Sequence, residues 1–564
     1  MLILVLLAGL NSYLSADVQA EVIPYTQGTV QSTQSGQVRG AEAYAGHSLV
    51  WKSIPYASAP AGELRWKAPQ DPMPWTGVFD ATRSGNIGLQ LSGTQIVGSE
   101  DCLNLDIYRP NSNATNLPVL FYIHGGNNQT GTSAEFNAER FAVEANIVVI
   151  SINYRLGLLG FNNLPALQSG NALENSGNYT LLDFAKSLDW VRENVRAFGG
   201  NPDNITISGF SAGGRDVMAL LISPVVAGKF HKAISFSGGM TLADSEMSAQ
   251  LVARAIAMLV VEDQIKPAEQ DAYDWLMSNA PDVREYLYQL PADRLARLMI
   301  NADIHMSVFP HLYNDGTVLP KEGFRTPHYN TVPLIMITAT QEFSSFARRD
   351  PEFAPYTDDA LLTDKDADRR YQFAKEYGSQ LYRLFNVQES AEILHAAYTA
   401  PIYAGVFAWG TDTAIVGEEM GRLYGAYHGV WMPFLTREMT GMSSRFSGSF
   451  QGAGAQKLAD AFTRYIANFV WTGDPNSAGL VTWNPWTAGG NEPDQLLLNA
   501  DQNAAIITMS KEQTNYDTVL KAIETDTTVS QEEKNTLITR VLSGRWFSRK
   551  LDQHFGNTGI WVGR

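Results

Sequence analysis

Five apolar runs, each rich in β-branched residues, most constrain what this chain can fold into. None of them alternates regularly between polar and apolar residues, so none reads as a strand with one face in water. Such runs are typical of strands buried on both faces, as in a parallel sheet covered by helices. We therefore expect a central, mostly parallel sheet. The five runs are residues 117–124, 147–154, 204–209, 232–237 and 332–338.

Helical patterns lie between these runs. The clearest covers residues 179–198, where apolar side chains recur every three or four positions until Gly199 and Gly200 end the pattern. Strands that alternate with helices predict an α/β fold, with right-handed crossovers and helices on both faces of the sheet. Two further stretches, 249–309 and 364–397, are mostly helical in pattern. We expect them to be insertions over the carboxyl edge of the sheet, where α/β proteins hold their sites.

The composition is that of a large globular protein, with 564 residues of which 45% are hydrophobic. A net charge of −17 without clustered Lys and Arg excludes a nucleic-acid partner. Residues 1–20 begin with MLILVLLAGL, which is too short to span a bilayer and predicts a signal peptide on a secreted or periplasmic protein. Residues 21–564 then form one domain without a stable membrane span. The single cysteine, Cys102, allows no internal disulfide.

The stretch GFSAGGRD places Ser211 between an apolar run and a helical pattern. A Gly-x-Ser-x-Gly in that context is typical of a nucleophile elbow, a strained turn that lifts the serine hydroxyl above the edge of the sheet. Gly209 and Gly213 stand at the two positions where the turn leaves no room for a side chain. We therefore interpret Ser211 as a nucleophile.

A serine nucleophile needs a base and a third group that orients the base. His428 lies beside a glycine in YHGVW, and Glu342 follows the apolar run at residues 332–338, so these two are the favoured base and acid. Asp315 is a rival acid, although its Asp-Gly pair is typical of a turn. Position alone leaves the base open, because histidines also stand after Ser211 at His231, His305, His311, His328, His395 and His554.

Several blocks of the chain, in the right order, resemble the type-B carboxylesterase and cholinesterase family of α/β hydrolases. They extend from about residue 46 to about residue 486. The blocks are IPYASAP with GELRWKAP, SEDCLNLDIYRP, HGGNNQTG, NYRLGLLGF, FGGNPDNITISGFSAGG, ATQEFSSF and YHGVWMPF. The resemblance implies the α/β-hydrolase fold, a central mostly parallel sheet with helices on both faces and helical insertions over the active site, for all of residues 21–564.

The same resemblance implies a serine hydrolase with a catalytic triad, in which Ser211 is the nucleophile, Glu342 the acid and His428 the base. It also implies an oxyanion hole made of three backbone N–H groups, those of Gly126, Asn127 and Ala212. No metal and no cofactor are implied.

The chain departs from the family pattern at five positions. Asn127 replaces a glycine, so we expect its side chain on the acyl side of the pocket and the loss of a glycine-only backbone angle. Phe210 and Trp431 replace two carboxylates, which predicts an aromatic wall that contacts the substrate; the alternative is that both rings pack beneath the elbow. Arg215 and Asp216 stand where small residues are usual, either as a local pair or in contact with a neighbouring loop.

The sequence thus favours an enzyme, a serine carboxylic-ester hydrolase that acts on a neutral, apolar or aromatic small-molecule ester. Cationic alcohols are disfavoured, because the stretch GNIGLQLSG lacks the tryptophan with which cholinesterases hold a quaternary ammonium group. The alternative is a catalytically weak or silent cholinesterase-like binding or adhesion protein, since fold alone does not fix function.

Overall fold

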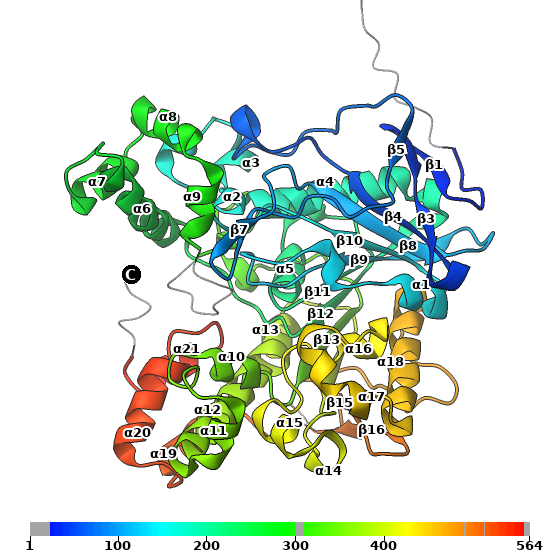
Figure 1. Cartoon of the computed structure of the whole chain (residues 1–564), viewed down its shortest axis with the longest axis vertical. Coiled ribbons are helices and arrows are strands. Elements are labelled where there is room, and N and C mark those ends of the chain that lie inside the picture. The colour runs from blue at the N-terminus through cyan, green and yellow to red at the C-terminus, as the bar shows by residue number, and fades with distance from the viewer. Residues whose placement is uncertain (1–22, 300–309, 490–491, 512–513, 558–564) are drawn as a thin grey trace, which may run out of the picture.

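The computed structural model describes residues 23–299, 310–489, 492–511 and 514–557, and its centre is one large mixed sheet (Figure 1). In these residues the sheet has 11 strands, in the order β16-β15-β14-β13-β12-β11-β9-β10-β8-β4-β3. The strands from β15 to β10 run parallel, and the pairs at both edges are antiparallel. The bounds are β3 Ala41–Ala43, β4 Ser48–Pro55, β8 Asn104–Pro110, β9 Leu117–Ile123, β10 Val148–Ile152, β11 Gly200–Phe210, β12 Lys232–Phe236, β13 Leu334–Ala339, β14 Ile402–Phe407, β15 Gln495–Ala500 and β16 Ala505–Ser510.

The five predicted runs are confirmed as strands β9 to β13, and every residue of β9, β10, β12 and β13 is buried. Side chains along each strand alternate between two cores, one on each face of the sheet. In β9, Val119 and Phe121 belong to one core, whereas Leu120 and Tyr122 belong to the other. A strand with apolar neighbours on both faces needs no polar alternation, and this explains the continuous runs.

Strand β8 did not stand out in the sequence because it contains Asp106 and Arg109, both of which are buried. Asp106 accepts a hydrogen bond from the backbone N–H of Ser53 at 2.8 Å, and Arg109 donates to the carbonyl of Phe198 at 2.8 Å. Buried charges with such partners are compatible with a central strand, although they disrupt its apolar pattern.

Helices cover both faces of the sheet, as expected for this fold class. Helices α4 (Tyr179–Asn194) and α5 (Ala212–Leu220) pack against β11 on one face, and α18 (Ala453–Thr472) packs against β11 and β9 on the other. The predicted helix at residues 179–198 is confirmed as α4 and a 3₁₀ turn, and Gly199 ends it with a φ of 73°.

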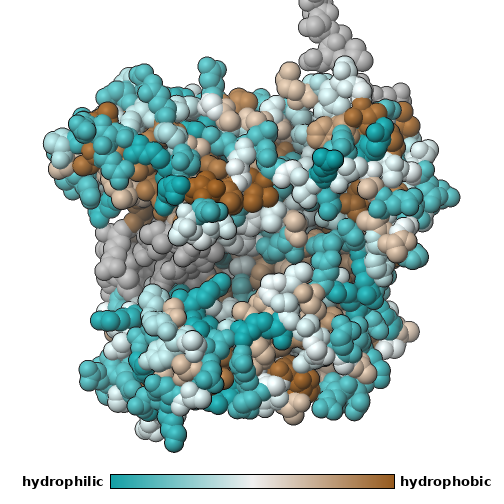
Figure 2. Space-filling view, in the orientation of Figure 1, coloured by the Kyte–Doolittle hydropathy of each residue, from teal (hydrophilic) through white to brown (hydrophobic). Residues whose placement is uncertain are grey.

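Two groups of helices form the lobes on the left of Figure 1. The first lobe confirms the helical prediction for residues 249–299, while residues 300–309 lie outside the described part. The second lobe confirms the prediction for residues 364–397. Figure 2 shows hydrophilic side chains over most of the surface of both lobes, with apolar patches on the first. The helices are α6 Ser245–Glu262, α7 Glu269–Leu276, α8 Pro281–Gln289 and α9 Ala292–Arg297 in the first lobe, and α10 Ser344–Arg349, α11 Asp358–Thr363, α12 Lys365–Arg383 and α13 Ser390–His395 in the second.

The C-terminal part of the described chain returns to the second lobe. Helices α19 (Tyr516–Thr525), α20 (Gln531–Thr536) and α21 (Arg549–His554) lie beside α12 in Figure 1, and α19 contacts α12. Residues 1–20, which we interpret as a signal peptide, lie outside the described residues. In the part of the chain that the structure describes, no helix has the length and apolar character needed to cross a bilayer.

Candidate active site

Ser211 occupies a strained turn between β11 and α5, with φ 57° and ψ −114°. A Cβ on Gly209 would lie 2.2 Å from the carbonyl oxygen of Gly213, and a Cβ on Gly213 would lie 2.2 Å from the carbonyl oxygen of Ile123. Any larger residue at either position would therefore clash with backbone atoms. The turn presents a partly exposed serine above the sheet.

Glu342 and His428, which are 86 positions apart, meet in a hydrogen bond of 2.5 Å between Oε2 of Glu342 and Nδ1 of His428. The other carboxylate oxygen, Oε1, accepts from the Ser237 hydroxyl at 2.6 Å, the Thr338 hydroxyl at 2.8 Å and the Ala339 N–H at 2.7 Å. Burial acts to raise the pKa of Glu342, but the adjacent His428 and these hydrogen bonds together lower it below its usual value. The carboxylate is therefore ionised and fixed in orientation.

Aromatic rings surround the His428 imidazole. The ring centroids of Phe210, Phe346 and Tyr382 lie 4.6, 5.1 and 5.6 Å from that of His428. Burial raises the pKa of the Tyr382 phenol, and the side chain of Ser211 is close enough to lower it in part. One tyrosine thus contacts both the hydroxyl and the imidazole. Nε2 of His428 is buried and has no hydrogen-bond partner among the described residues.

The loop that contains Gly126 and Asn127 passes directly over the elbow. A Cβ on Gly125 would lie 3.1 Å from Cβ of Ser211. Ala212 is the first residue of α5, so its N–H has no partner within the helix. The sequence-predicted oxyanion donors therefore come from two segments that both border Ser211.

Asn127 retains a left-handed backbone, with φ 56°. Our expectation that replacing glycine would lose this angle is wrong, because asparagine tolerates the left-handed region better than most residues do. Its side chain is also not open to an acyl group: it is 2% exposed, and its Oδ1 accepts a hydrogen bond of 2.5 Å from Arg215 and one of 3.1 Å from the indole N–H of Trp546.

Arg215 and Asp216 both reach the loop over the elbow, which settles the alternatives left open by the sequence. Arg215 bonds Asn127, while Asp216 accepts a hydrogen bond of 2.9 Å from the side-chain amide of Asn128. Burial raises the pKa of Asp216 to about 7. The two residues that follow the elbow thus hold two consecutive asparagines of the loop.

Two titratable groups, the buried His124 and the partly exposed Glu135, lie beneath the same loop. His124 stacks on Tyr154 at 4.3 Å, and burial lowers its pKa to about 4, so it is neutral. Glu135 accepts from the backbone N–H of Gly125 at 3.2 Å and from the Tyr122 hydroxyl at 3.1 Å, and burial raises its pKa to about 7. These contacts fix the start of the loop, and no sequence motif pointed to Glu135.

The aromatic wall is divided between a surface ring and a buried one. Phe210 is partly exposed and, with His428, lines a cavity of about 320 Å³. Trp431 is fully buried: it stacks on Phe236 with ring centroids 3.8 Å apart and meets Phe210 at 5.6 Å. Trp431 therefore packs beneath the elbow as a support for Phe210, which was the alternative that the sequence left open for this residue.

The rival residues are engaged elsewhere. The carboxylate of Asp315 accepts from the backbone N–H groups of Thr317, Val318 and Leu319, as expected of a turn. His554 pairs with Glu524 at 2.8 Å. Residue 305 lies outside the described part of the chain.

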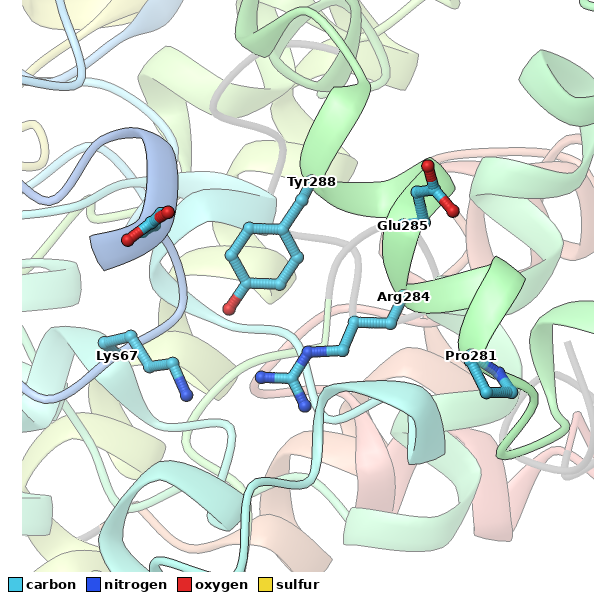
Figure 3. A pocket seen from close by; sticks show the side chains of 6 residues that line it. Lys67, Pro281, Arg284, Glu285 and Tyr288 are labelled. Atoms are coloured by element: carbon cyan, nitrogen blue, oxygen red, sulfur yellow. The ribbon is translucent and has the colours of Figure 1, made fainter.

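A second cavity, of about 380 Å³, lies between α8 and the N-terminal segment (Figure 3). None of the sequence-predicted site residues lines it. Its charges are mixed, and Lys67 is already paired with Glu174 at 3.0 Å. It is lined by Glu63, Lys67, Pro281, Arg284, Glu285 and Tyr288. Within the described residues, no group of three or more His, Cys, Asp or Glu side chains is arranged to hold a metal ion.

Comparison with known proteins places the chain in a family. A sequence profile described as the Carboxylesterase family matches residues 27–384. The fold and the profile together define the class: the chain belongs to the carboxylesterase family of α/β hydrolases and is accordingly an ester hydrolase.

Individual relatives support the same assignment. The chain is 38% identical to the para-nitrobenzyl esterase of Bacillus subtilis over 275 residues, which are 46% of this chain and 55% of that protein. It is 30% identical to the fumonisin B1 esterase of Sphingopyxis macrogoltabida, over 80% of this chain and 84% of that protein. Among solved structures, a carboxylesterase of Geobacillus stearothermophilus matches with a TM-score of 0.66 and 28% identity, over 86% of this chain and 98% of that one.

Proposed function

We propose that this protein hydrolyses carboxylic esters through a Ser-His-Glu triad of Ser211, His428 and Glu342. The observation that carries the proposal is the 2.5 Å bond between Glu342 and Nδ1 of His428, beside a serine held on a strained turn. With Nδ1 bonded to an ionised carboxylate, the neutral imidazole carries its proton on Nδ1 and offers the lone pair of Nε2 to the serine hydroxyl.

The reaction proceeds in two halves. Ser211 attacks the ester carbonyl while Nε2 of His428 takes the hydroxyl proton and then passes it to the leaving alcohol. A water molecule, activated by the same nitrogen, then hydrolyses the acyl-enzyme. Glu342 stabilises the imidazolium that forms in each half.

The negative charge of each tetrahedral intermediate is held by the N–H groups of Gly126, Asn127 and Ala212. Each such donor contributes about 3 kcal/mol to stabilisation of the transition state. Gly126 and Asn127 have positive φ values of 96° and 56°, and turns of this kind can line an anion-binding concavity with successive backbone N–H groups.

The substrate we propose is a neutral, apolar or aromatic ester. Phe210 lines the cavity beside His428 in place of the carboxylate that is common in the family at this position. Glu135 and Glu438 also line this cavity, so the proposed preference depends on the ring of Phe210 next to His428. The names of the relatives, which include a para-nitrobenzyl esterase, a fumonisin B1 esterase and an acylcarnitine hydrolase, do not select one alcohol group. Paired steady-state rates on a p-nitrophenyl ester and a choline ester of equal acyl length test this preference, and a preference for choline contradicts it.

A fluorophosphonate probe tests the nucleophile directly. We expect the folded wild-type protein to be labelled and the Ser211→Ala variant to remain unlabelled and to lose p-nitrophenyl butyrate hydrolysis. Unlabelled, inactive wild-type protein would instead favour the binding or adhesion role.

We further propose that the protein is secreted or periplasmic, on the basis of the apolar run at the start of residues 1–20. N-terminal sequencing of protein recovered from the medium or periplasm tests this. Cleavage after Ala20 is expected, whereas an intact Met1 on cytoplasmic protein would contradict it.

A further inference from the structure

One side-chain oxygen in the loop over the elbow is shared by two distant parts of the chain. Oδ1 of Asn127 accepts from Nη2 of Arg215, which is four residues after the nucleophile, and from Nε1 of Trp546, which is 419 positions away. Neither donor belongs to the blocks that carry the family resemblance. Both converge on the residue whose backbone N–H we assign to the oxyanion hole.

Arg215 is held so that this bond is its main polar contact. The side chain is buried, its guanidinium carbon lies 4.4 Å from the centre of the Trp546 ring, and Nη1 has no hydrogen-bond partner among the described residues. A bond from a charged donor is roughly twice as strong as a neutral one. Trp546 thus acts twice: its ring faces the guanidinium, and its N–H bonds the same acceptor.

The loop needs such restraint. Asn127 and Asn128 both have a φ of 56°, a conformation that costs a non-glycine residue free energy. The N–H of Asn127 points at an oxyanion only while its peptide plane keeps this orientation. Side-chain bonds to Oδ1 fix the residue from outside the pocket.

We propose that Arg215 and Trp546 are positioning residues, which hold Asn127 by its side chain so that its N–H stays aimed at the developing oxyanion. This makes the segment 545–548 part of the active site, and it rests on the esterase function proposed above. We call the two bonds from Arg215 and Trp546 to Oδ1 of Asn127 the clamp. The typical family loop has glycine at this position, so the clamp replaces a glycine-only turn by an asparagine that is fixed from two sides.

The segment 545–548 is itself firmly docked. Arg545 forms a buried ion pair with Asp350 at 2.6 Å, and Phe547 stacks on Tyr382 with centroids 4.7 Å apart and meets Phe343 at 5.4 Å. Phe343 follows the triad acid in sequence, and Tyr382 contacts both Ser211 and His428. The same segment therefore touches the acid side of the site and the oxyanion side.

A double-mutant cycle tests the clamp. Trp546→Phe removes the indole N–H but keeps a ring over Arg215, so we expect kcat for p-nitrophenyl butyrate to fall about five-fold with KM changed less than about two-fold. Arg215→Met removes a charge-assisted donor, and a fall of about ten-fold or more is expected. In an Asn127→Gly background the shared acceptor is absent, so both substitutions should then change kcat less than about two-fold.

Two further measurements separate positioning from general damage. The inhibition constant of a trifluoromethyl ketone, whose adduct with Ser211 places an oxyanion in the hole, should rise in proportion to the loss of kcat/KM. Trp51→Phe is the matched control, because it removes another buried indole N–H, bonded to the carbonyl of Thr29 at 2.8 Å, and it should leave kcat unchanged.

Equal losses from Trp546→Phe with and without Asn127→Gly, or losses confined to KM, would overturn the clamp. Such a result leaves the proposed function intact as long as Ser211→Ala remains inactive. Residual hydrolysis by purified Ser211→Ala would instead overturn the proposed function.

Discussion

Replacing Glu342 by glutamine tests the geometry of the proposed triad, because the hydrogen-bond partners of Glu342 decide how the new side chain would be oriented. Oε1 of Glu342 accepts from the backbone N–H of Ala339, which can only donate, and from the hydroxyls of Ser237 and Thr338. A glutamine that turned its amide nitrogen toward Ala339 would leave that buried N–H unsatisfied at a cost of roughly 2 kcal/mol. The amide nitrogen must therefore face His428.

The consequence for His428 follows from hydrogen-bond chemistry. An amide nitrogen only donates, so Nδ1 must become an acceptor and the ring proton moves to Nε2. Nε2 then cannot accept the proton of Ser211. We expect Glu342→Gln to lower kcat by about 10⁴-fold, the size seen when the analogous acid of a serine protease becomes an amide, which corresponds to about 5 kcal/mol.

The measurement is kcat/KM for p-nitrophenyl butyrate, with urea unfolding to compare stabilities. Because all three bonds to Oε1 persist, the free energy of unfolding should change by less than about 2 kcal/mol. Thr338→Val is the matched control: it removes one donor to Oε1 without altering the histidine tautomer, and it should cost less than about ten-fold in kcat. A folded Glu342→Gln variant that keeps more than a tenth of wild-type activity would refute this account of the site.

Three further predictions concern the wall, the buried carboxyl and the elbow. Phe210→Glu returns a carboxylate beside His428, so the ratio of kcat/KM for a neutral ester to that for a choline ester should fall about ten-fold; an unchanged ratio would remove Phe210 from substrate selection. Because burial raises the pKa of Asp216 to about 7, the folded state keeps a proton that the unfolded chain loses near pH 4, and this group alone should lower stability by about 3 kcal/mol from pH 5 to pH 8. Glu135, whose pKa is also raised to about 7, adds a fall of its own, so melting temperatures of Asp216→Asn should fall less across that range than those of the wild type, and equal falls would contradict the assignment. Gly213→Ala would place a Cβ 2.2 Å from the carbonyl oxygen of Ile123, and we expect a loss of about 3 kcal/mol or more in urea unfolding, whereas a wild-type midpoint would show that the elbow is less tight than described.

The parts of the fold that sequence patterns predicted are those whose cause is local. The runs that form β9 to β13 are apolar because both faces of each strand are buried. A continuous apolar run can be recognised within a few residues of sequence, so these strands were predicted. Strand β14 was not predicted, and Gly405 at its centre weakens the strand pattern. A Cβ at Gly405 would lie 3.0 Å from the ring of Trp483. Glycine is therefore favoured here by a contact with a residue far along the chain, which no local sequence pattern reveals.

The residues of the candidate site also fall into two groups, those that a local motif marks and those that only a distant contact defines. Ser211, Glu342 and His428 stand in recognisable motifs, whereas Tyr382 and Trp546 lie in ordinary helical or loop sequence. Trp546 meets Asn127 across 419 positions, and nothing near it in the chain marks that contact. The roles of Arg215 and Asp216 were open for a related reason, since the partners of a buried charge depend on which loop passes over it.

The late position of Trp546 has a consequence for synthesis. A chain that has been translated as far as residue 511 already contains the 11 strands of the central sheet that the structure describes and all three residues of the proposed triad. It still lacks Trp546, whose indole N–H donates a hydrogen bond to Oδ1 of Asn127. On the proposal made above, full turnover therefore requires translation to pass residue 546, after the sheet and the proposed triad residues have been made.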